Sequence, residues 1–580
     1  MNILVFVKQI PEVNRITYDP VTKRIVRTGV PLEINPFDKR AVEEAIRIKE
    51  KTPSHVTVIS MGPPSAADIL NNSLRMGADR AILLTDRQFA GSDTLVTSMV
   101  LSDVVRQLNP DLVLCGKYSL DGETSQVPPE IAQMSGLNFK SSVSSISFDI
   151  DGKMFEVTQD AETGLVKYAV PFPALFSVSE KINRARYVKP EVPDMRDRIE
   201  TWDAGKLSIK VSGVEDSPTA VAGTEQINSF RQVKMIGKED AFSLIVSSSA
   251  KKEKNQENHV KMYDPSDDSQ VLGVAVGSPE VSLEVSGALY GLSREYKFKI
   301  TMVGDIDPGV LNGMACHSYV YLKDSTNMET AEYLCSMIRE RKPKFVIFPS
   351  NIDGREIAGY VAAKLKLGLT ADCVDLKVEN GELIQYKPAF GGGIVARITS
   401  KTSPQMSTVR KGMFRKVITD DVFTLVREEP HGKDSIVRTG FEPVPSGFAP
   451  LSSSQVVFGL GKGIARRERI PEITEVASMI GASVGGSRPV VDFGFIPRQN
   501  QIGITGESIS PELYVALGVS GADNHVVGIR YAKKILAVNS NPEAPIFKYS
   551  DYGVISDAYE FLNELRDHIT LIREDQRSSR

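Results

Sequence analysis

Three neighbouring stretches near the C-terminus decide how this chain folds: GGSRPVVDFGFIP (485–497), GITGESISPELYVALGVSGADNH (503–525) and AVNSNPEAPIFKYSDYGVISD (537–557). Gly, Ser and Thr are frequent there, and only a few titratable side chains, among them Arg488 and His525, lie close by. Small residues let backbone N–H groups surround a pyrophosphate, while isolated polar side chains orient a ring. An earlier stretch, VVFGLGKGI (456–464), reads as a strand that runs into glycines, with a helix to follow. Together the stretches predict a Rossmann-like nucleotide-binding domain.

Two long strings make this prediction more specific. They are GxTGxxxxPELYxAxGxSGAxxH, present at 503–525, and AxNxxPEAPIFxxxDYG, present at 537–553. Both closely resemble the FAD-binding domain of the electron-transfer flavoprotein α subunit. Strings of this length are unusual, so the resemblance implies that the C-terminal domain binds FAD.

The resemblance also implies which residues touch the flavin. In the family an arginine that matches Arg488 lies over the isoalloxazine, where a permanent cation favours an anionic reduced ring. A threonine that matches Thr505 lies near flavin N5, and a histidine that matches His525 lies near the N1–C2=O edge, where it would stabilise negative charge if protonated. The alternatives remain a surface pair of Arg488 with Asp492, an ordinary turn at Thr505 and a structural histidine. The complete set of expected FAD contacts is Ser487, Arg488, Gln501, Gly503, Thr505, Gly506, Ser520, Gly521, His525, Asn539 and Asp557.

The chain departs from the family pattern beside this site. Ile504 stands where Gln is usual, and Glu507 stands where Lys is usual. These changes leave the local polarity and the flavin potential open.

Composition and length describe an ordinary globular chain. It has 580 residues, 41% of them apolar and 24% charged, and about three to four domains are expected at roughly 150 residues each. A net charge of −4 gives no reason to expect nucleic acid or an anionic membrane surface as a partner. The four cysteines are widely spaced, which argues against a disulfide framework, a zinc site or a Cys-ligated cluster. The N-terminal apolar run is too short for a secretory signal, and no run is long enough to span a membrane, so we expect a cytoplasmic protein without membrane insertion.

The first part of the chain contains the same plan twice. Residues 56–86 and 298–324 each read as a strand, a turn, a helix and a second strand. Residues 110–123 and 343–356 each read as a buried strand that ends in a loop with Asp-Gly, and a helix follows. Buried strands that alternate with helices predict parallel sheets covered on both faces. Two unrelated α/β domains with similar patterns remain the alternative.

Further strings in these repeated parts resemble both subunits of the same family. NPFDKRAVEEAIRIKE (35–50) resembles the β subunit, whereas GLTADCVDL (368–376) and KPAFGGG (387–393) resemble the first domain of the α subunit. The fold class is therefore α/β, with two similar parallel-sheet nucleotide-binding-type domains and a C-terminal FAD-binding domain, in a β–α fusion. The expected parts are a β-like domain (1–205), a connecting arm (206–240), an α-like first domain (241–428), a Pro, Gly and Ser-containing linker (429–455) and the FAD domain (456–580).

The β-like domain carries a second candidate nucleotide site. LDGETSQVPP (120–129) follows a buried strand, and short polar residues at that position suit a phosphate. In the family the site holds AMP or, in proteins that bifurcate electrons, a second FAD. Glu123, Ser125 and Pro128 depart from the second form, so AMP, FAD and an empty pocket all remain open; the duplicate loop IDGRE (352–356) is expected to bind none. The expected residues are Asn35, Asp38, Asp121, Gly122, Thr124, Ser125, Gln126 and Val127.

The resemblance implies an electron carrier rather than an enzyme with its own substrate. FAD would accept electrons from acyl-CoA or related flavin dehydrogenases, as in fatty acid β-oxidation, and pass them to a membrane quinone oxidoreductase. Val192 or Met195 would anchor the dehydrogenase, unless the segment 188–195 is only a Pro-rich surface loop. An NADH-dependent, electron-bifurcating flavoprotein is the alternative, and an adenine-nucleotide sensor is a third class. A fused chain can act as a monomer.

Overall fold

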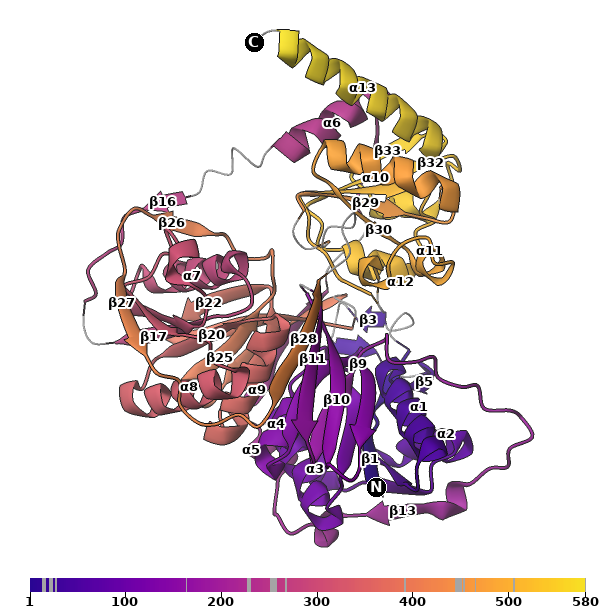
Figure 1. The fold of residues 1–580 in the computed structure, drawn as a ribbon, viewed down its shortest axis with the longest axis vertical. Helices are drawn as coiled ribbons and strands as arrows, with labels where there is room; N and C mark the ends of the chain where they lie inside the picture. The colour runs from indigo at the N-terminus through magenta and orange to yellow at the C-terminus, as the bar shows by residue number, and fades with distance from the viewer. Residues whose placement is uncertain are drawn as a thin grey trace. The chain divides into compact units, whose positions relative to one another are not determined.

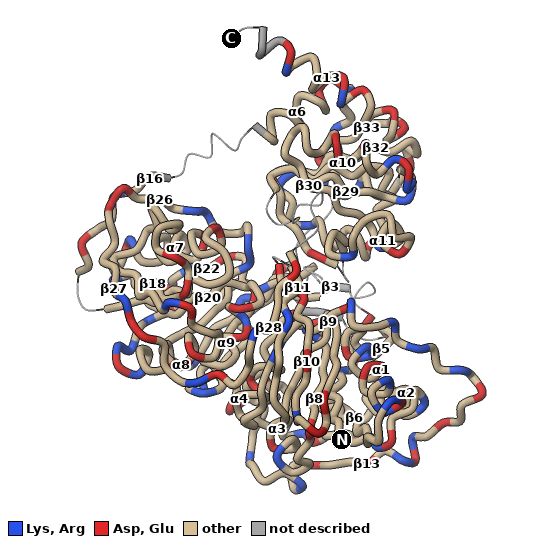
Figure 2. Tube along the Cα trace, viewed as in Figure 1, with Lys and Arg blue, Asp and Glu red and all other residues tan. Residues whose placement is uncertain are grey.

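A computed structural model describes residues 1–12, 17–19, 24–26, 29–162, 164–226, 231–250, 258–266, 269–390, 393–443, 451, 454–464, 466–503 and 506–578. The chain divides into two compact units, which Figure 1 shows as ribbons. The first unit comprises Met1–Glu225, Asn258–Phe390 and Ile394–Glu442, and the second comprises Gln226–Glu257, Gly391–Gly393 and Pro443–Arg580. Acidic and basic residues are interspersed along both (Figure 2), in keeping with the small net charge.

The first half of unit one is built on a ten-stranded sheet. Its strand order is β13-β7-β6-β1-β8-β12-β9-β10-β11-β28, and the strands from β13 to β9 are parallel. Strands such as β8, LVLCG, are buried along their whole length because helices cover both faces. The bounds are β1 (Asn2–Phe6), α1 (Pro36–Lys51), β6 (His55–Met61), α2 (Ala67–Met76), β7 (Arg80–Leu84), α3 (Thr94–Leu108), β8 (Leu112–Gly116), α4 (Val127–Ser135), β9 (Asn138–Asp149), β10 (Met154–Ala161), β11 (Gly164–Pro171), β12 (Ala174–Val178) and β13 (Ile199–Trp202).

The second half repeats this sheet strand for strand. Its order, β27-β19-β18-β17-β20-β25-β21, matches β13-β7-β6-β1-β8-β12-β9 when each strand is replaced by its counterpart. The duplicated α/β fold expected from the sequence is therefore confirmed. The bounds are β17 (Gln270–Ala275), α7 (Pro279–Ser293), β18 (Lys299–Gly304), β19 (Ser318–Leu322), α8 (Asn327–Arg341), β20 (Phe345–Pro349), α9 (Ile352–Leu365), β21 (Leu369–Cys373), β22 (Asp375–Glu379), β23 (Glu382–Ala389), β24 (Ile394–Ser400), β25 (Gln405–Val409) and β27 (Thr424–Glu428).

Two local predictions for the second half were wrong. The helix expected between β18 and β19 is only a 3-10 turn, η7 (Pro308–Val310), in a segment that contains Pro and two glycines. The Asp353-Gly354 pair lies in the first turn of α9 and not in a loop. Asn351 starts this helix directly after β20, because its side-chain oxygen accepts a hydrogen bond from Gly354 N at 2.7 Å.

The two halves exchange their last strands. β14 (Thr219–Gln226) follows the first half but adds to the β24-β23-β22 sheet of the second. β28 (Val437–Pro443) follows the second half but adds to β11 of the first. The segment 429–455, expected to be only a linker, therefore also contributes a strand.

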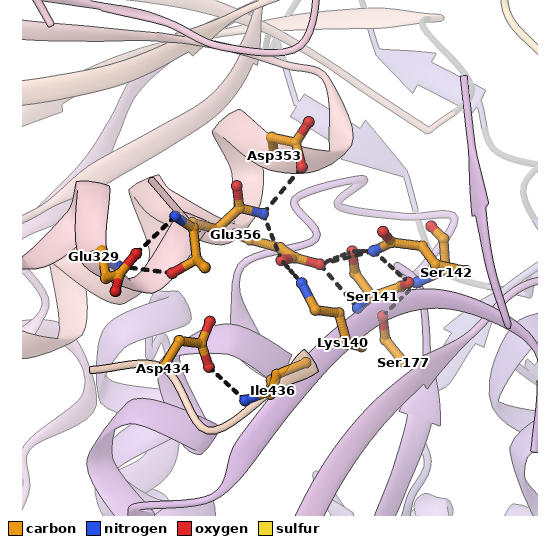
Figure 3. A network of polar contacts seen from close by, with 12 residues as sticks. Lys140, Ser141, Ser142, Ser177, Glu329, Asp353, Glu356, Asp434 and Ile436 are labelled. Carbon is orange, nitrogen blue, oxygen red and sulfur yellow. Dashed lines mark hydrogen bonds and ion pairs between the residues drawn. The ribbon is translucent and has the colours of Figure 1, made fainter. Parts of the chain in front are cut away.

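A buried polar cluster also joins the two halves, and Figure 3 shows it. Lys140 on β9 and Glu356 on α9 form an ion pair at 3.3 Å, and both side chains are less than a tenth exposed. Ser141, Gln159 and Asn327 also donate hydrogen bonds to the Glu356 carboxylate. Nearby, α4 packs against its own counterpart α9. The contact between the halves is thus made by equivalent elements of the duplicated fold.

The second unit is a parallel sheet in the order β15-β33-β32-β31-β29-β30. Helix α6 packs on this unit, where Phe242 lies 5.0 Å from Phe561 between ring centroids. The boundary expected at residue 241 places α6 with the second α/β half, whereas its contacts group it with the C-terminal domain. The bounds are β15 (Lys234–Met235), α6 (Lys238–Ala250), β29 (Val456–Leu460), α10 (Ile470–Met479), β30 (Ser483–Gly486), α11 (Arg488–Asp492), β31 (Leu513–Leu517), α12 (Asp523–Val526), β32 (Lys534–Asn539), β33 (Tyr552–Ile555) and α13 (Ala558–Ser578).

The described residues include neither a membrane-crossing helix nor a cluster of metal-ligating side chains. None of the helices there combines the length and the apolar character that a membrane crossing needs. Within the same residues no group of three or more His, Cys, Asp or Glu side chains could hold a metal ion. All four cysteines are free and buried.

Candidate functional site

The C-terminal sheet has a topological switch point next to β29. The chain continues from β29 to β30 on one side and from β31 to β32 and β33 on the other. The loops that follow β29 and β31 meet there, because Gly461 N donates to Leu517 O at 2.9 Å. A Cβ on Gly461 would lie 2.0 Å from the carbonyl oxygen of Gly518, so only glycine fits. Nucleotides bind in open α/β sheets outside the strand ends at such a point.

The structure brings most of the predicted FAD residues to this edge of the sheet. Ser487 follows β30, Ser520 and Gly521 follow β31, Asn539 ends β32 and Asp557 follows β33. Because the carboxyl ends of parallel strands share one edge, these residues lie along that edge, where open α/β sheets form their nucleotide-binding crevice.

Two of these side chains also hold the crevice together. Asn539 donates from Nδ2 to Val519 O at 2.8 Å and thereby ties β32 to the loop after β31. The Asp557 carboxylate accepts from Tyr559 N and Glu560 N at 2.9 and 3.0 Å at the start of α13.

Arg488 lies at the start of α11 and is largely exposed. Its side chain is 69% exposed, and its Nε donates to the Asp492 carboxylate at 3.2 Å, four residues along the helix. This geometry is the surface pair considered as the alternative to a flavin contact. The position above the isoalloxazine therefore stays a prediction.

The loop before β31 runs beside the end of β30. Gln501 forms a parallel bridge with Gly486, and Ile502 N donates to Gly486 O at 2.9 Å. Gly506 N donates to Gly503 O at 2.9 Å. Thr505 lies outside the described residues, so its expected contact with flavin N5 stays a prediction.

His525 is buried, and its two ring nitrogens face protein groups. Nε2 lies 2.7 Å from the hydroxyl of Tyr514, and Nδ1 lies 3.2 Å from the carbonyl oxygen of Ile502. Burial lowers the pKa of His525 to about 4, although the hydrogen bond to Ile502 opposes this shift. The ring is therefore neutral near pH 7, so the stabilisation of negative charge considered for a protonated ring does not apply to this form, and the contact with the flavin stays a prediction.

The residues at this edge fit an anionic nucleotide. Arg498 Nε and Gln499 Nε2 are buried and have no hydrogen-bond partner among the described residues. Both lie just before Gln501, beside the end of β30, and Asn500 fixes this segment by donating to Val484 O at 2.8 Å. Since buried N–H groups are nearly always paired, these two donors suit the phosphates or the ring oxygens of a bound FAD. Sequence reasoning missed them, because nothing in the string RQN separates a buried donor from a surface one.

The first half of unit one has its own switch point, between β1 and β8. Asp38 accepts hydrogen bonds from Lys8 N at 2.8 Å and Gly116 N at 3.0 Å, where these two strands end. Asn35 donates from Nδ2 to Tyr118 O at 2.9 Å. Burial raises the pKa of Asp38 to about 7. Asn35 and Asp38 thus hold the backbone of the predicted second site.

The loop after β8 differs between the two copies. Residues 117–126 connect β8 to α4, whereas only Ser350 and Asn351 connect β20 to α9. Within the longer loop, Glu123 and Ser125 adopt left-handed backbone with φ of 49° and 56°. Strained backbone of this kind clusters at ligand sites.

Side chains of the second half hold this loop. Lys387 donates to Gly122 O, and Arg410 forms an ion pair with Glu123 at 3.5 Å. Gln126 in turn donates to Leu369 O at 3.0 Å. Sequence reasoning missed Lys387 as a contact, although it opens the string KPAFGGG. Gln126, predicted as a nucleotide contact, instead bonds to the backbone of the other half.

The remaining predicted residues of this second site follow one another along the same loop. Asp121 forms an ion pair with Lys8 at 2.8 Å, and its carboxylate also accepts from Gly122 N at 2.8 Å. Thr124 and Ser125 lie between Glu123 and the start of α4 at Val127. The structure therefore brings Asn35, Asp38, Asp121 and Gly122 together at the ends of β1 and β8, and the other four predicted residues follow along the loop to the start of α4.

The fold and these two crevices define a nucleotide-binding α/β protein with a duplicated domain. The family model of the electron transfer flavoprotein domain matches residues 22–207 and 318–436, and that of the electron transfer flavoprotein FAD-binding domain matches residues 450–530. The chain belongs to the electron transfer flavoprotein family and carries the β-like and α-like parts in one polypeptide.

Relatives match the two parts of the chain separately. The electron transfer flavoprotein subunit beta of Thermoanaerobacterium thermosaccharolyticum is 41% identical over 40% of this chain and 90% of its own length. The subunit alpha of the same organism is 35% identical over 43% of this chain and 78% of its own length. The protein FixB of Clostridium saccharobutylicum is 37% identical over 42% of this chain and 76% of its own length. A solved UDP-GlcNAc 2-epimerase from Neisseria meningitidis aligns with a TM-score of only 0.17, which supports no comparison.

Proposed function

We propose that this chain carries electrons from acyl-CoA or related flavin dehydrogenases to a membrane quinone oxidoreductase. The observation that carries the proposal is the FAD-binding family match over 450–530, which coincides with the crevice at the ends of β29 and β31. When bound there, FAD supplies the one-electron and two-electron chemistry. The surrounding residues then set affinity, orientation and potential.

Different residues at this edge of the sheet would contact different parts of FAD. The backbone of the loop at Ser520 and Gly521 lies at the phosphates, together with the unpaired donors of Arg498 and Gln499. Asn539 and Asp557 lie toward the ribose and adenine end. Arg488 brings a permanent positive charge, on a side chain that is largely exposed and pairs with Asp492.

In the candidate docking segment 188–195, Val192 is better placed than Met195 to contact a partner. Met195 packs against the core of the first half, whereas Val192 is half-buried on the loop. Arg75 on α2 fixes this loop by donating to Val192 O at 3.1 Å. Tyr187 is 80% exposed and is the largest apolar surface of the segment. We infer that Tyr187 and Val192 form the contact with a dehydrogenase.

A second nucleotide, AMP or FAD, is proposed for the loop 117–126. The ten-residue loop with strained backbone supports it, and the two-residue link in the other copy supports one such site per chain. A second FAD there would give the alternative function, an NADH-dependent electron-bifurcating flavoprotein.

Anaerobic reduction of the purified protein separates these functions. The flavin absorbance is followed while either NADH or a catalytic amount of acyl-CoA dehydrogenase with its substrate is added. We expect bleaching with the dehydrogenase and none with NADH, and a Tyr187→Ser variant should bleach more slowly with unchanged flavin content. Bleaching by NADH alone would establish the alternative, and no bleaching with either donor would contradict the carrier.

A further inference from the structure

Tyr514 and His525 form a buried pair in the C-terminal domain. Tyr514 lies on β31 and is fully buried, and His525 lies on α12 and is 5% exposed. The 2.7 Å contact between the hydroxyl and Nε2 and the 3.2 Å contact between Nδ1 and Ile502 O connect β31, α12 and the loop at Gln501–Gly503.

The surrounding backbone leaves room for this pair. A Cβ on Gly459 of β29 would lie 1.6 Å from the Tyr514 hydroxyl oxygen, so the tyrosine ring occupies the space above that glycine. A Cβ on Gly503 would lie 2.4 Å from Asn524 O, which means that the loop packs directly on α12. The pair therefore lies in a close-packed environment and not at a mobile surface.

The partners assign the protons of the imidazole. A carbonyl oxygen only accepts, so Nδ1 carries a hydrogen and donates it to Ile502 O. Nε2 then accepts from the Tyr514 hydroxyl, which is a donor because burial raises the pKa of Tyr514.

Charged groups on the neighbouring elements do not change this assignment. Asp523 on α12 accepts from the Tyr549 hydroxyl at 3.3 Å, and Glu512, just before β31, pairs with Lys533. Glu507 follows the loop, and Arg530 follows α12. The pKa of His525 is lowered by burial, the hydrogen bond to Ile502 opposes this shift, and no charged side chain is among its causes.

We propose that Tyr514 is a positioning residue that holds His525 as a neutral imidazole with its proton on Nδ1, and that this pair fixes the loop Gln501–Gly503 at the flavin site. The proposal rests on FAD binding in this domain. Its consequence is that His525 takes up no proton when the flavin is reduced. Arg488, which is permanently charged, remains to balance the negative charge.

Nitrogen NMR of the full-length, FAD-loaded protein, labelled with ¹⁵N-histidine, tests the tautomer directly. The chain has six histidines, and a His525→Gln variant identifies the signals of His525. We expect one protonated and one bare ring nitrogen, unchanged between about pH 5.5 and 8 where a free histidine titrates. An imidazolium in this range, or a proton on Nε2, would overturn the proposal.

The Tyr514→Phe variant tests the positioning role. Loss of the hydroxyl should move the Nε2 signal toward that of an unprotonated nitrogen without a hydrogen bond, while Nδ1 stays protonated. The affinity for FAD should fall about fivefold, the effect of one lost neutral hydrogen bond. An unchanged Nε2 signal would show that Tyr514 does not position His525.

The pH dependence of the flavin midpoint potential is the second test, and it needs only the wild-type and His525→Gln proteins. Equal slopes in the two proteins are expected, because a neutral His525 is not linked to reduction. A step present only in the wild-type protein would show that His525 gains a proton on reduction and would overturn the proposal. Absence of bound flavin in the wild-type protein would instead contradict the proposed function.

Discussion

Removing the negative charge of Glu356 should destabilise the first unit strongly. This carboxylate receives five hydrogen bonds: Oε1 accepts from Ser141 N, Ser141 Oγ and Gln159, and Oε2 accepts from Lys140 and Asn327. Burial raises the pKa of Glu356, but Lys140 and the hydrogen bonds outweigh this and hold it below its usual range. The cluster joins β9 of one half to α8 and α9 of the other (Figure 3).

A Glu356→Gln substitution leaves Lys140 buried without its counter-ion. The new amide also places N–H donors where Oε2 accepted from Lys140 and Asn327. Breaking a buried ion pair by removal of one partner costs about 3 to 5 kcal/mol. The ring of Tyr168, whose centroid lies 4.5 Å from Lys140 Nζ, contacts the ammonium in both proteins and does not change the difference, so we expect a loss of about 3 to 5 kcal/mol.

Urea unfolding followed by tryptophan fluorescence measures this loss. Trp202 on β13 is the only tryptophan, so its signal reports the first unit. Glu379→Gln is the matched control, because it breaks an exposed pair with Arg397 and should cost less than about 1 kcal/mol.

A double variant, Lys140→Met with Glu356→Leu, should recover the part of the loss that comes from the unpaired ammonium, because an apolar pair needs no counter-ion. It should stay less stable than the wild type, because Ser141, Gln159 and Asn327 still lack their acceptor. If Glu356→Gln lowers the free energy of unfolding no more than Glu379→Gln does, the buried ion pair does not stabilise the first unit as expected.

Three further predictions follow from the same structure. Because the folded pKa of His525 is below its unfolded value, the stabilisation it contributes is complete above about pH 6.5 and is lost toward pH 4. The C-terminal domain should lose about 2 kcal/mol between pH 7 and pH 5, seen as lower hydrogen-exchange protection factors in 510–530 after correction for the intrinsic pH dependence of exchange, and absent in His525→Gln. Gly461→Ala should sharply reduce bound flavin per chain, measured by absorbance, because its Cβ collides with the neighbouring loop; full flavin content would refute this. Asp38→Asn should cost about 1 to 3 kcal/mol in the Trp202 transition, since one amide oxygen replaces two acceptors for Lys8 N and Gly116 N; an unchanged midpoint would contradict it.

The duplicated fold could be predicted because local sequence patterns determine its strands and helices. Buried strands such as β8 and β20 are apolar throughout, and helices separate them at regular intervals. The start of α9 could not be placed, since Asp353-Gly354 is equally suited to a turn and to a helix that Asn351 caps. The exchanged strands β14 and β28 were also missed, because exposed edge strands of mixed polarity have no strong periodicity.

The candidate site was predictable only where family strings gave the positions. Ser487, Ser520, Gly521, Asn539 and Asp557 lie together because each follows or ends a parallel strand. The environment of single side chains could not be predicted. The protonation of His525 depends on Tyr514 and on burial, and both are set by tertiary packing.

The same limit applies to the second site. Lys387 reaches the loop 117–126 from the other half of the duplicated unit, a separation along the chain that local patterns do not bridge. The β8–α4 connection has ten residues and the β20–α9 connection has two. This difference could not be predicted, because it depends on where α9 begins.

Counting the nucleotides released from the purified, denatured chain tests whether it is a flavin-carrying protein. We expect one FAD per chain from the C-terminal domain and one further nucleotide from the loop 117–126. AMP as the second nucleotide agrees with a carrier, and a second FAD would make NADH the next electron donor to test. A chain that releases no flavin, even after reconstitution with FAD, would contradict the account.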